Sequence, residues 1–118
     1  MFKDLDPLLH SQVRLGIMSI LIGVKNAEFS YLLENIKTTK GNLSFQMNKL
    51  KEAGYIEVKK SSKGNYPLTT CEITEEGANA YEIYVNSIDD YFKKFKNGIL
   101  RTGHHGESNM INGKTTFR

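Results

Sequence analysis

The stretch from Thr38 to Ile73, TTKGNLSFQMNKLKEAGYIEVKKSSKGNYPLTTCEI, contains the patterns that decide the fold. Its first half places Leu43, Met47 and Leu50 at positions i, i+4 and i+7, which form one stripe along a helix. A threonine at 38 or 39 can cap the start, and Ala53-Gly54 is typical of a helix end. We therefore expect a short helix over about 39–53, with one side buried and the other exposed.

The second half of this stretch has the composition of a β-hairpin. Residues 55–60 alternate between two faces and are rich in β-forming side chains, which predicts a strand. Residues 61–67, SSKGNYP, are typical of a loop with a Gly-Asn turn, and residues 68–73 form the returning strand. The hairpin therefore has a basic, polar tip, over about 59–68.

Two further helices are expected before this stretch. Pro7 suits the first position of a helix that Asp6 caps, and residues 11–24 are apolar nearly all round, as an enclosed central helix requires. Residues 29–37 then form a short amphipathic helix. The expected order is three helices followed by the hairpin.

A long helix is expected after the hairpin, over residues 74–96. Acidic residues lie near its start and lysines near its end, where each complements the helix dipole. Its apolar residues recur at spacings of three and four, which favours a dimerisation helix, although the same stripe could pack on the chain's own core. The residues expected to form a homodimer contact are Leu8, Leu9, Tyr81, Tyr84, Val85, Ile88, Tyr91, Phe92 and Phe95.

The length of 118 residues suits a single domain, which we place at residues 1–96. Residues 97–118 are rich in Gly, Asn, Ser and Thr without periodicity, and we expect a disordered tail. The single cysteine, Cys71, cannot form an intramolecular disulfide, which favours a reducing compartment. No apolar run is long enough to cross a membrane, so we expect a cytoplasmic protein with no membrane partner.

The sequence predicts no metal site, no cofactor and no enzyme activity. Adjacent histidines at 104 and 105 lack the further ligands that a metal site needs. A glycine-rich phosphate loop is missing, and so is a set of Ser, His and Asp residues suited to nucleophilic catalysis.

The formal net charge of +3 is unevenly distributed. Residues 37–63 contain seven lysines and two glutamates, whereas residues 72–90 contain six acidic residues and no Lys or Arg. Such a cluster suits a polyanion, because clustered lysines neutralise phosphates, although it could also be an ordinary solvated face. We expect these lysines to gather on one surface.

Together, these elements predict a mainly α chain with a small β-hairpin, an α+β fold of the winged helix-turn-helix type. The third helix suits the DNA major groove, and the hairpin, or wing, suits the backbone or minor groove. Asn42, Gln46 and Asn48 could pair with adenine, Lys49 with guanine or phosphate, and Phe45 with a thymine methyl, unless Phe45 contacts a dimer partner or the wing. The full set of expected DNA-binding residues is Arg14, Thr39, Lys40, Gly41, Asn42, Ser44, Phe45, Gln46, Asn48, Lys49, Lys59, Lys60, Lys63, Asn65 and Tyr66.

The chain also resembles the small winged-helix transcriptional regulators of the MarR/ArsR-like group over about residues 5–95. The most specific runs are GNLSFQMNKLKEAGYIEVKK and TTCEITEEG. The resemblance implies that Ser44, Phe45 and Gln46 lie where relatives contact DNA, often through His or Arg. Phe45 departs from that pattern and leaves the operator sequence open. The Cys and His clusters of the metal-sensing members are missing.

The leading hypothesis is a homodimeric regulator of transcription that binds double-stranded DNA at half-sites about 34 Å apart. The alternative is a protein-interaction module that uses the same fold without DNA. An unidentified small-molecule effector could occupy a crevice lined by Tyr81, Tyr84 and Tyr91, although aromatic stripes at helical spacing are more often packing. Redox sensing through Cys71 is disfavoured, because a thiol in a strand is usually a small buried apolar group.

Overall fold

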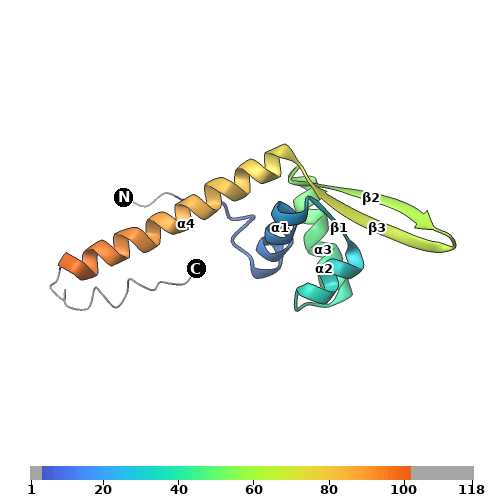
Figure 1. The fold of residues 1–118 in the computed structure, drawn as a ribbon, viewed down its shortest axis with the longest axis horizontal. Helices are drawn as coiled ribbons and strands as arrows, with labels where there is room; N and C mark the ends of the chain where they lie inside the picture. Colours follow the sequence, from blue (N-terminus) through green and yellow to red (C-terminus); the bar gives the residue numbers. More distant parts are fainter. Residues whose placement is uncertain (1–3, 102–118) are drawn as a thin grey trace.

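The computed structural model describes residues 4–101, with side chains to residue 96. The elements are α1 (Gln12–Val24), β1 (Asn26–Glu28), α2 (Phe29–Asn35), α3 (Lys40–Glu52), β2 (Ile56–Lys63), β3 (Tyr66–Ile73) and α4 (Glu75–Arg101). The three short helices form a compact body, from which α4 extends at one end and the β2–β3 hairpin at the other (Figure 1). This confirms the expected α+β winged-helix fold.

The start of α1 differs from the expectation for Asp6 and Pro7. Residues 7–9 form a turn, in which the Asp6 side chain accepts from the backbone N–H of Leu8 at 2.9 Å. The helix begins at Gln12, with Ser11 as its cap. The prediction was wrong because an Asx turn uses the same side-chain oxygen as a helix cap.

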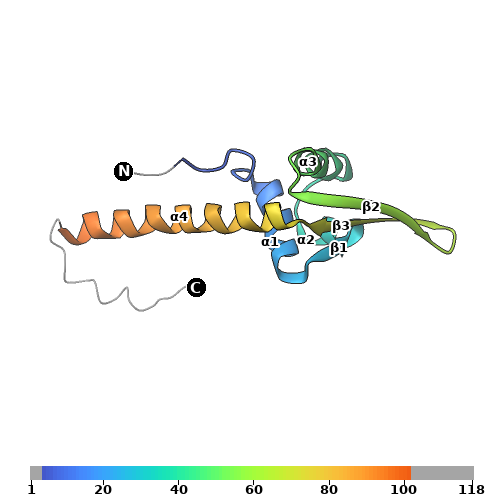
Figure 2. The ribbon, with the colours of Figure 1, turned by 90° about the horizontal axis from the view of Figure 1, so that it is seen from above.

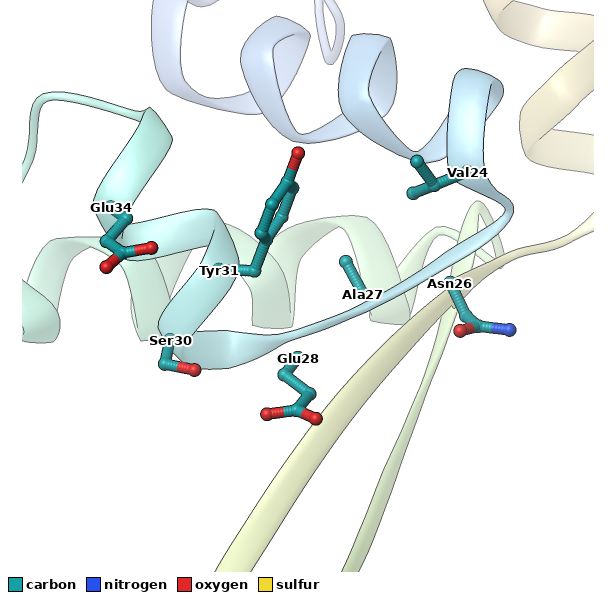
Figure 3. A pocket seen from close by; sticks show the side chains of 7 residues that line it. All are labelled: Val24, Asn26, Ala27, Glu28, Ser30, Tyr31 and Glu34. Carbon is teal, nitrogen blue, oxygen red and sulfur yellow. The ribbon is translucent and has the colours of Figure 1, made fainter.

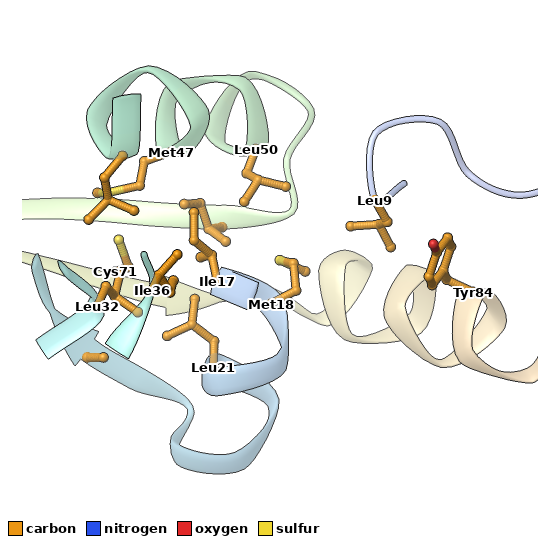
Figure 4. Packing of buried hydrophobic residues seen from close by; sticks show 13 residues of the cluster. Leu9, Ile17, Met18, Leu21, Leu32, Ile36, Met47, Leu50, Cys71 and Tyr84 are labelled. Atoms are coloured by element: carbon orange, nitrogen blue, oxygen red, sulfur yellow. The ribbon is translucent and has the colours of Figure 1, made fainter. Parts of the chain in front are cut away.

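The core lies where α1, α2 and α3 meet the sheet (Figure 4). Leu43, Met47 and Leu50 are all buried in it, which confirms the predicted inner side of α3. In contrast, α1 is not enclosed along its whole length, because Ile22 and Val24 in its last turn are exposed. These two apolar side chains are not part of the chain's own core, whereas Leu21 in the same turn is buried in it.

A three-stranded antiparallel sheet replaces the expected simple hairpin. The strand order is β1-β3-β2, and Ala27 of β1 pairs with Cys71 of β3. Strand β1 was not predicted, because three residues are too few for a detectable alternation. This strand joins α1 to α2 and fixes both against the sheet (Figure 2).

The hairpin strands are longer than expected, and the loop is shorter. Only Gly64 and Asn65 lie between Lys63 and Tyr66, and Gly64 has a φ of 64°. A type II′ turn needs such a positive φ at its first central position. Pro67 lies inside β3 opposite Ser62, one pair beyond the closing pair, where its missing N–H points away from β2.

The long helix α4 also exceeds its predicted length. Residues 97–101 continue it, so the expected tail does not begin at residue 97. Residues 102–118, the rest of that expected tail, lie outside the described residues. The first half of α4 packs on α1 and the N-terminal segment through Tyr81, Tyr84 and Ile88.

Candidate nucleic-acid interface

The outward side of α3 is exposed and mostly polar. Thr39 caps the helix by accepting from the backbone N–H of Asn42 at 3.1 Å, which fixes where the helix begins. The buried stripe on the opposite side then determines which residues face outward. The exposed residues of the predicted DNA-binding set on this helix and its cap are Thr39, Lys40, Gly41, Asn42, Ser44, Phe45, Asn48 and Lys49.

Four side chains form a hydrogen-bonded chain along one flank of α3, which we call the amide relay. Arg14 donates to the side-chain oxygen of Gln46, and Gln46 Nε2 donates to Asn42 Oδ1 at 3.1 Å. Asn42 Nδ2 donates in turn to Thr38 Oγ1 at 2.8 Å. Gln46 is half-buried and Asn42 is exposed, so the relay runs outward from the body toward the surface of α3.

Arg14 lies in a different setting from the one expected of a phosphate contact. It is half-buried on α1, and its Nε donates to the backbone oxygen of Leu8 at 2.6 Å. Its Nη1 is the donor to Gln46. The guanidinium therefore joins the N-terminal segment to α3 within this chain.

Phe45 projects from the exposed side of α3 and carries a cation against its ring. Its side chain is 56% exposed, and Lys49 Nζ lies 4.9 Å from the ring centroid. Both side chains stay exposed in this cation–π contact. The pair presents an apolar edge beside a positive charge.

The lysines of the wing do not lie on one surface, contrary to expectation. Lys60 stands opposite Thr69 on the side of the hairpin that faces α3. Lys59 is on the other side, where its Nζ lies 3.6 Å from Glu72 Oε1. Strand alternation places Lys63 with Lys59, because side chains point to opposite faces in turn.

The tip of the wing is fully solvated. Lys63, Asn65 and Tyr66 are all exposed there, and Tyr66 reaches 77% exposure. Within the described part of the chain, no other element packs on this tip. It can therefore contact a curved polyanion at several angles.

Two hollows bring α3 and the wing together around Ser44. One, of about 230 Å³, is lined by Ser44, Asn48 and Lys60 among others. The other, of about 430 Å³, is lined by Ser44, Lys40 and Thr69 among others. Lys40 and Lys60 therefore lie on either side of Ser44, in the angle between helix and hairpin.

Most exposed residues of α3 were predicted from the sequence, but Thr38 was not predicted to be part of the amide relay. Its spacing gave a usable signal, because residues 38, 42 and 46 follow one another at intervals of four. The pairing of Arg14 with Gln46 joins residues 32 positions apart, and no local pattern could show it.

The expected dimerisation residues divide into three groups by burial. Leu9 and Tyr84 are buried in the chain's own core, and Tyr84 OH lies 2.9 Å from His10 Nδ1. Leu8, Tyr81, Ile88 and Tyr91 are half-buried. Val85, Phe92 and Phe95 are exposed, with Phe92 at 65% and Phe95 at 66%.

The tyrosines of the expected effector crevice make contacts within the chain. Tyr81 OH lies 2.9 Å from Ser19 Oγ, and Tyr84 contacts His10 as described. A separate hollow of about 530 Å³ lies between the end of α1, β1 and α2, where Glu28, Glu34 and Tyr31 line it (Figure 3). Its two carboxylates make it unsuited to an anion.

Cys71 is buried in β3, and burial raises the pKa of its thiol to about 11. Within residues 4–101, no group of three or more His, Cys, Asp or Glu side chains is placed to hold a metal ion. In the same part of the chain, no helix combines the length and apolar character needed to span a membrane.

Comparison with known proteins agrees with this architecture. The model of a family described as the winged helix DNA-binding domain matches residues 13–92. An uncharacterized protein of Methanocaldococcus jannaschii is 37% identical over 81 residues, which are 69% of this chain and 88% of that protein. The chain therefore belongs to the winged helix DNA-binding domain family.

Two solved structures share this winged-helix fold. A transcriptional regulator homologue from Pyrococcus horikoshii OT3 is 28% identical, with a TM-score of 0.69 over 75% of this chain and 87% of that one. A MarR-family regulator from Enterococcus faecalis V583 is 16% identical, with a TM-score of 0.65 over 80% and 84% of the two chains, and shows the fold alone. The family match and the shared fold confirm the winged-helix part of the expected resemblance.

Proposed function

We propose that the chain is a sequence-specific regulator of transcription that binds double-stranded DNA as a homodimer. In this proposal α3 enters the major groove, and the wing contacts the backbone or minor groove. The observation that carries it is the position of Lys40 and Lys60 on either side of Ser44, beside the exposed polar side of α3. A duplex seated on α3 would bring phosphates near both lysines.

The chemistry of the exposed surface supports base contacts as well as phosphate contacts. Asn42 and Asn48 carry amides that can pair with adenine, and Lys49 can donate to guanine or phosphate. Phe45 offers an apolar edge for a thymine methyl. A surface built for phosphates alone would need lysines but not this row of amide and apolar groups.

The homodimer is proposed from the exposed stripe of α4. Val85, Ile88, Phe92 and Phe95 follow at spacings of three and four, and the last two are exposed beyond the part of α4 that packs on the body. A second copy of the helix would cover them, since exposed aromatic stripes of this kind mark interaction sites. Two copies would then present two α3 helices to half-sites about 34 Å apart.

Charge reversal tests the DNA-binding surface directly. The variant Lys40→Glu with Lys60→Glu should lose at least about tenfold in affinity for DNA in an equilibrium titration, because two phosphate contacts become repulsive. The matched control is Lys25→Glu with Lys93→Glu, which makes the same change in net charge at residues that line neither hollow. Equal losses in both variants would show that only overall charge matters and would contradict this surface.

The protein-interaction module remains the second candidate function, carried by the exposed aromatic residues of α4. It predicts DNA affinity that is negligible at physiological salt. Salt-dependent binding of the wild-type chain, weakened by Lys40→Glu with Lys60→Glu, would exclude it. An effector and a cytoplasmic location stay predictions from the sequence.

A further inference from the structure

The amide relay has a fixed direction, and Arg14 sets it. Arginine can only donate hydrogen bonds, so the group of Gln46 that faces it must be the oxygen. The Gln46 nitrogen is then turned toward Asn42, which must present its own oxygen. The Asn42 nitrogen consequently faces the hydroxyl of Thr38. Each amide is oriented by the one before it.

This direction matters because an amide presents a different pattern when it is rotated by half a turn. Asparagine and glutamine recognise adenine by accepting from N6 and donating to N7, so the oxygen and nitrogen must lie on particular sides. A free exposed Asn42 could exchange the two by rotating about its last bond. In the relay, one N–H of Asn42 is used and the second is left for a base.

Arg14 is itself well anchored for this task. Its Nε is held by the backbone oxygen of Leu8 at 2.6 Å, while its Nη1 holds Gln46. The Leu8 segment is in turn fixed by the Asp6 carboxylate, which accepts from Leu8 N–H at 2.9 Å and from Tyr55 OH at 2.6 Å. The orientation of the relay therefore originates in the folded body and not on the DNA.

We propose that Arg14 is a positioning residue for base recognition. Through Gln46 it orients the Asn42 amide, so that Asn42 selects adenine at one base pair of each half-site. This inference rests on the proposed DNA-binding function. It adds that adenine is the base recognised, that Asn42 recognises it and that Arg14 orients the Asn42 amide. It assigns Arg14 a role different from the phosphate contact expected from its charge.

Four variants of relay residues test the proposal in selections from random duplex DNA. Arg14→Met removes the donors but keeps an unbranched side chain in place of the aliphatic part of arginine, and Arg14→Lys restores a donor. Gln46→Glu keeps a partner for Arg14 but offers only acceptors, so Asn42 must turn its nitrogen inward and reverse its amide. Because the added carboxylate weakens binding to all sequences alike, the quantity compared is the preference for adenine over the other bases at one position.

The wild-type chain should prefer adenine there by roughly 5- to 150-fold, the range expected for one bidentate contact. Arg14→Met and Gln46→Glu should each remove most of this preference, and Arg14→Lys should retain it. Thr38→Val, which removes the last hydrogen-bond acceptor of the relay without touching α1, should weaken the preference partly. Circular dichroism confirms that each variant is folded.

The salt dependence of affinity separates positioning from phosphate binding. If Arg14 only positions Gln46, Arg14→Met leaves the slope of log affinity against log salt unchanged. If Arg14 neutralises a phosphate, the slope falls by about 0.9. The inference would be overturned if Arg14→Met kept the wild-type preference for adenine, or if its salt slope fell by about 0.9. Either result would leave the DNA-binding function standing. A wild-type chain that binds no DNA would instead overturn the proposed function.

Discussion

The backbone of Tyr55 fills the space that a Cβ atom on Gly77 would need, with Tyr55 Cα 3.0 Å from that position. The same junction is tied by Thr74, whose hydroxyl donates to Gly54 O at 2.6 Å and accepts from Gly77 N–H at 3.0 Å. These contacts explain the threonine and the glycine of the Thr-Glu-Glu-Gly run at the start of α4. They set the direction in which α4 leaves the body.

The variant Gly77→Ala should therefore destabilise the fold by about 1–3 kcal/mol, because the added methyl meets backbone that cannot move aside freely. Gly23→Ala is the matched control, since nothing lies within 4 Å of its Cβ position in a helix. It should raise the free energy of unfolding by up to about 1 kcal/mol. Urea denaturation measures both, and equal effects would contradict the close approach.

Cys71 should be unreactive in the folded protein. Burial raises the pKa of its thiol from 9.0 to about 11, so little thiolate forms at pH 8. A chromogenic disulfide reagent at pH 8 should label it only on unfolding. Rapid labelling of the native chain would contradict its burial and reopen a redox role.

The same shift makes stability depend on alkaline pH. Above pH 9 the unfolded thiol loses its proton while the folded thiol keeps it, so the free energy of unfolding falls as pH rises toward 11. Urea denaturation should show a steeper fall for the wild type than for Cys71→Ala across this range. Parallel curves for the two proteins would contradict the shift.

Phe45→Ala should reduce DNA affinity about fivefold and leave stability nearly unchanged. The side chain is half-exposed in the free chain, so covering the remainder by a base contributes about 1 kcal/mol. Tyr31→Ala is the matched control, as Tyr31 is a similarly exposed aromatic that lines the hollow beside α2. Equal affinities of Phe45→Ala and the wild type would remove Phe45 from the interface.

Phe92→Asp should dissociate the proposed dimer, because a carboxylate would be buried in an apolar contact. Ile83→Asp is the matched control, since Ile83 is 64% exposed but lies on another side of α4. Sedimentation should give a dimer for the wild type and Ile83→Asp, and a monomer for Phe92→Asp. A monomeric wild type would contradict the dimer, and dissociation by Ile83→Asp alone would move the interface to that side.

The sequence predicted those parts of the fold whose signal is local. Leu43, Met47 and Leu50 form a stripe within one helix, and Thr39 caps it next to the first turn. In contrast, the short strand at 26–28 forms only because β3 offers it a partner. The hairpin is long because Gly64 allows a two-residue turn and because Pro67 stands where β2 needs no N–H from it. Both conditions depend on which residues of the two strands are paired.

In the candidate site, too, the features with a local sequence signal were predicted and those that depend on tertiary contacts were not. The exposed side of α3 follows from helical periodicity, so most residues expected to contact bases do face outward. Gln46 is the exception, because it is half-buried and bonded to Arg14. The placement of lysines on the wing depends on how the hairpin meets α3, and this separates Lys60 from Lys59. Arg14 was expected to contact a DNA phosphate. It instead bonds to Leu8 and Gln46, which lie in segments that only the tertiary fold brings together.

Selection of bound sequences from random duplex DNA, at about 50 mM and about 200 mM salt, tests the central claim most directly. The account predicts an enriched inverted repeat with half-site centres about 34 Å apart and affinity that falls steeply with salt. It would be contradicted by a wild-type chain that enriches no sequence at either salt concentration.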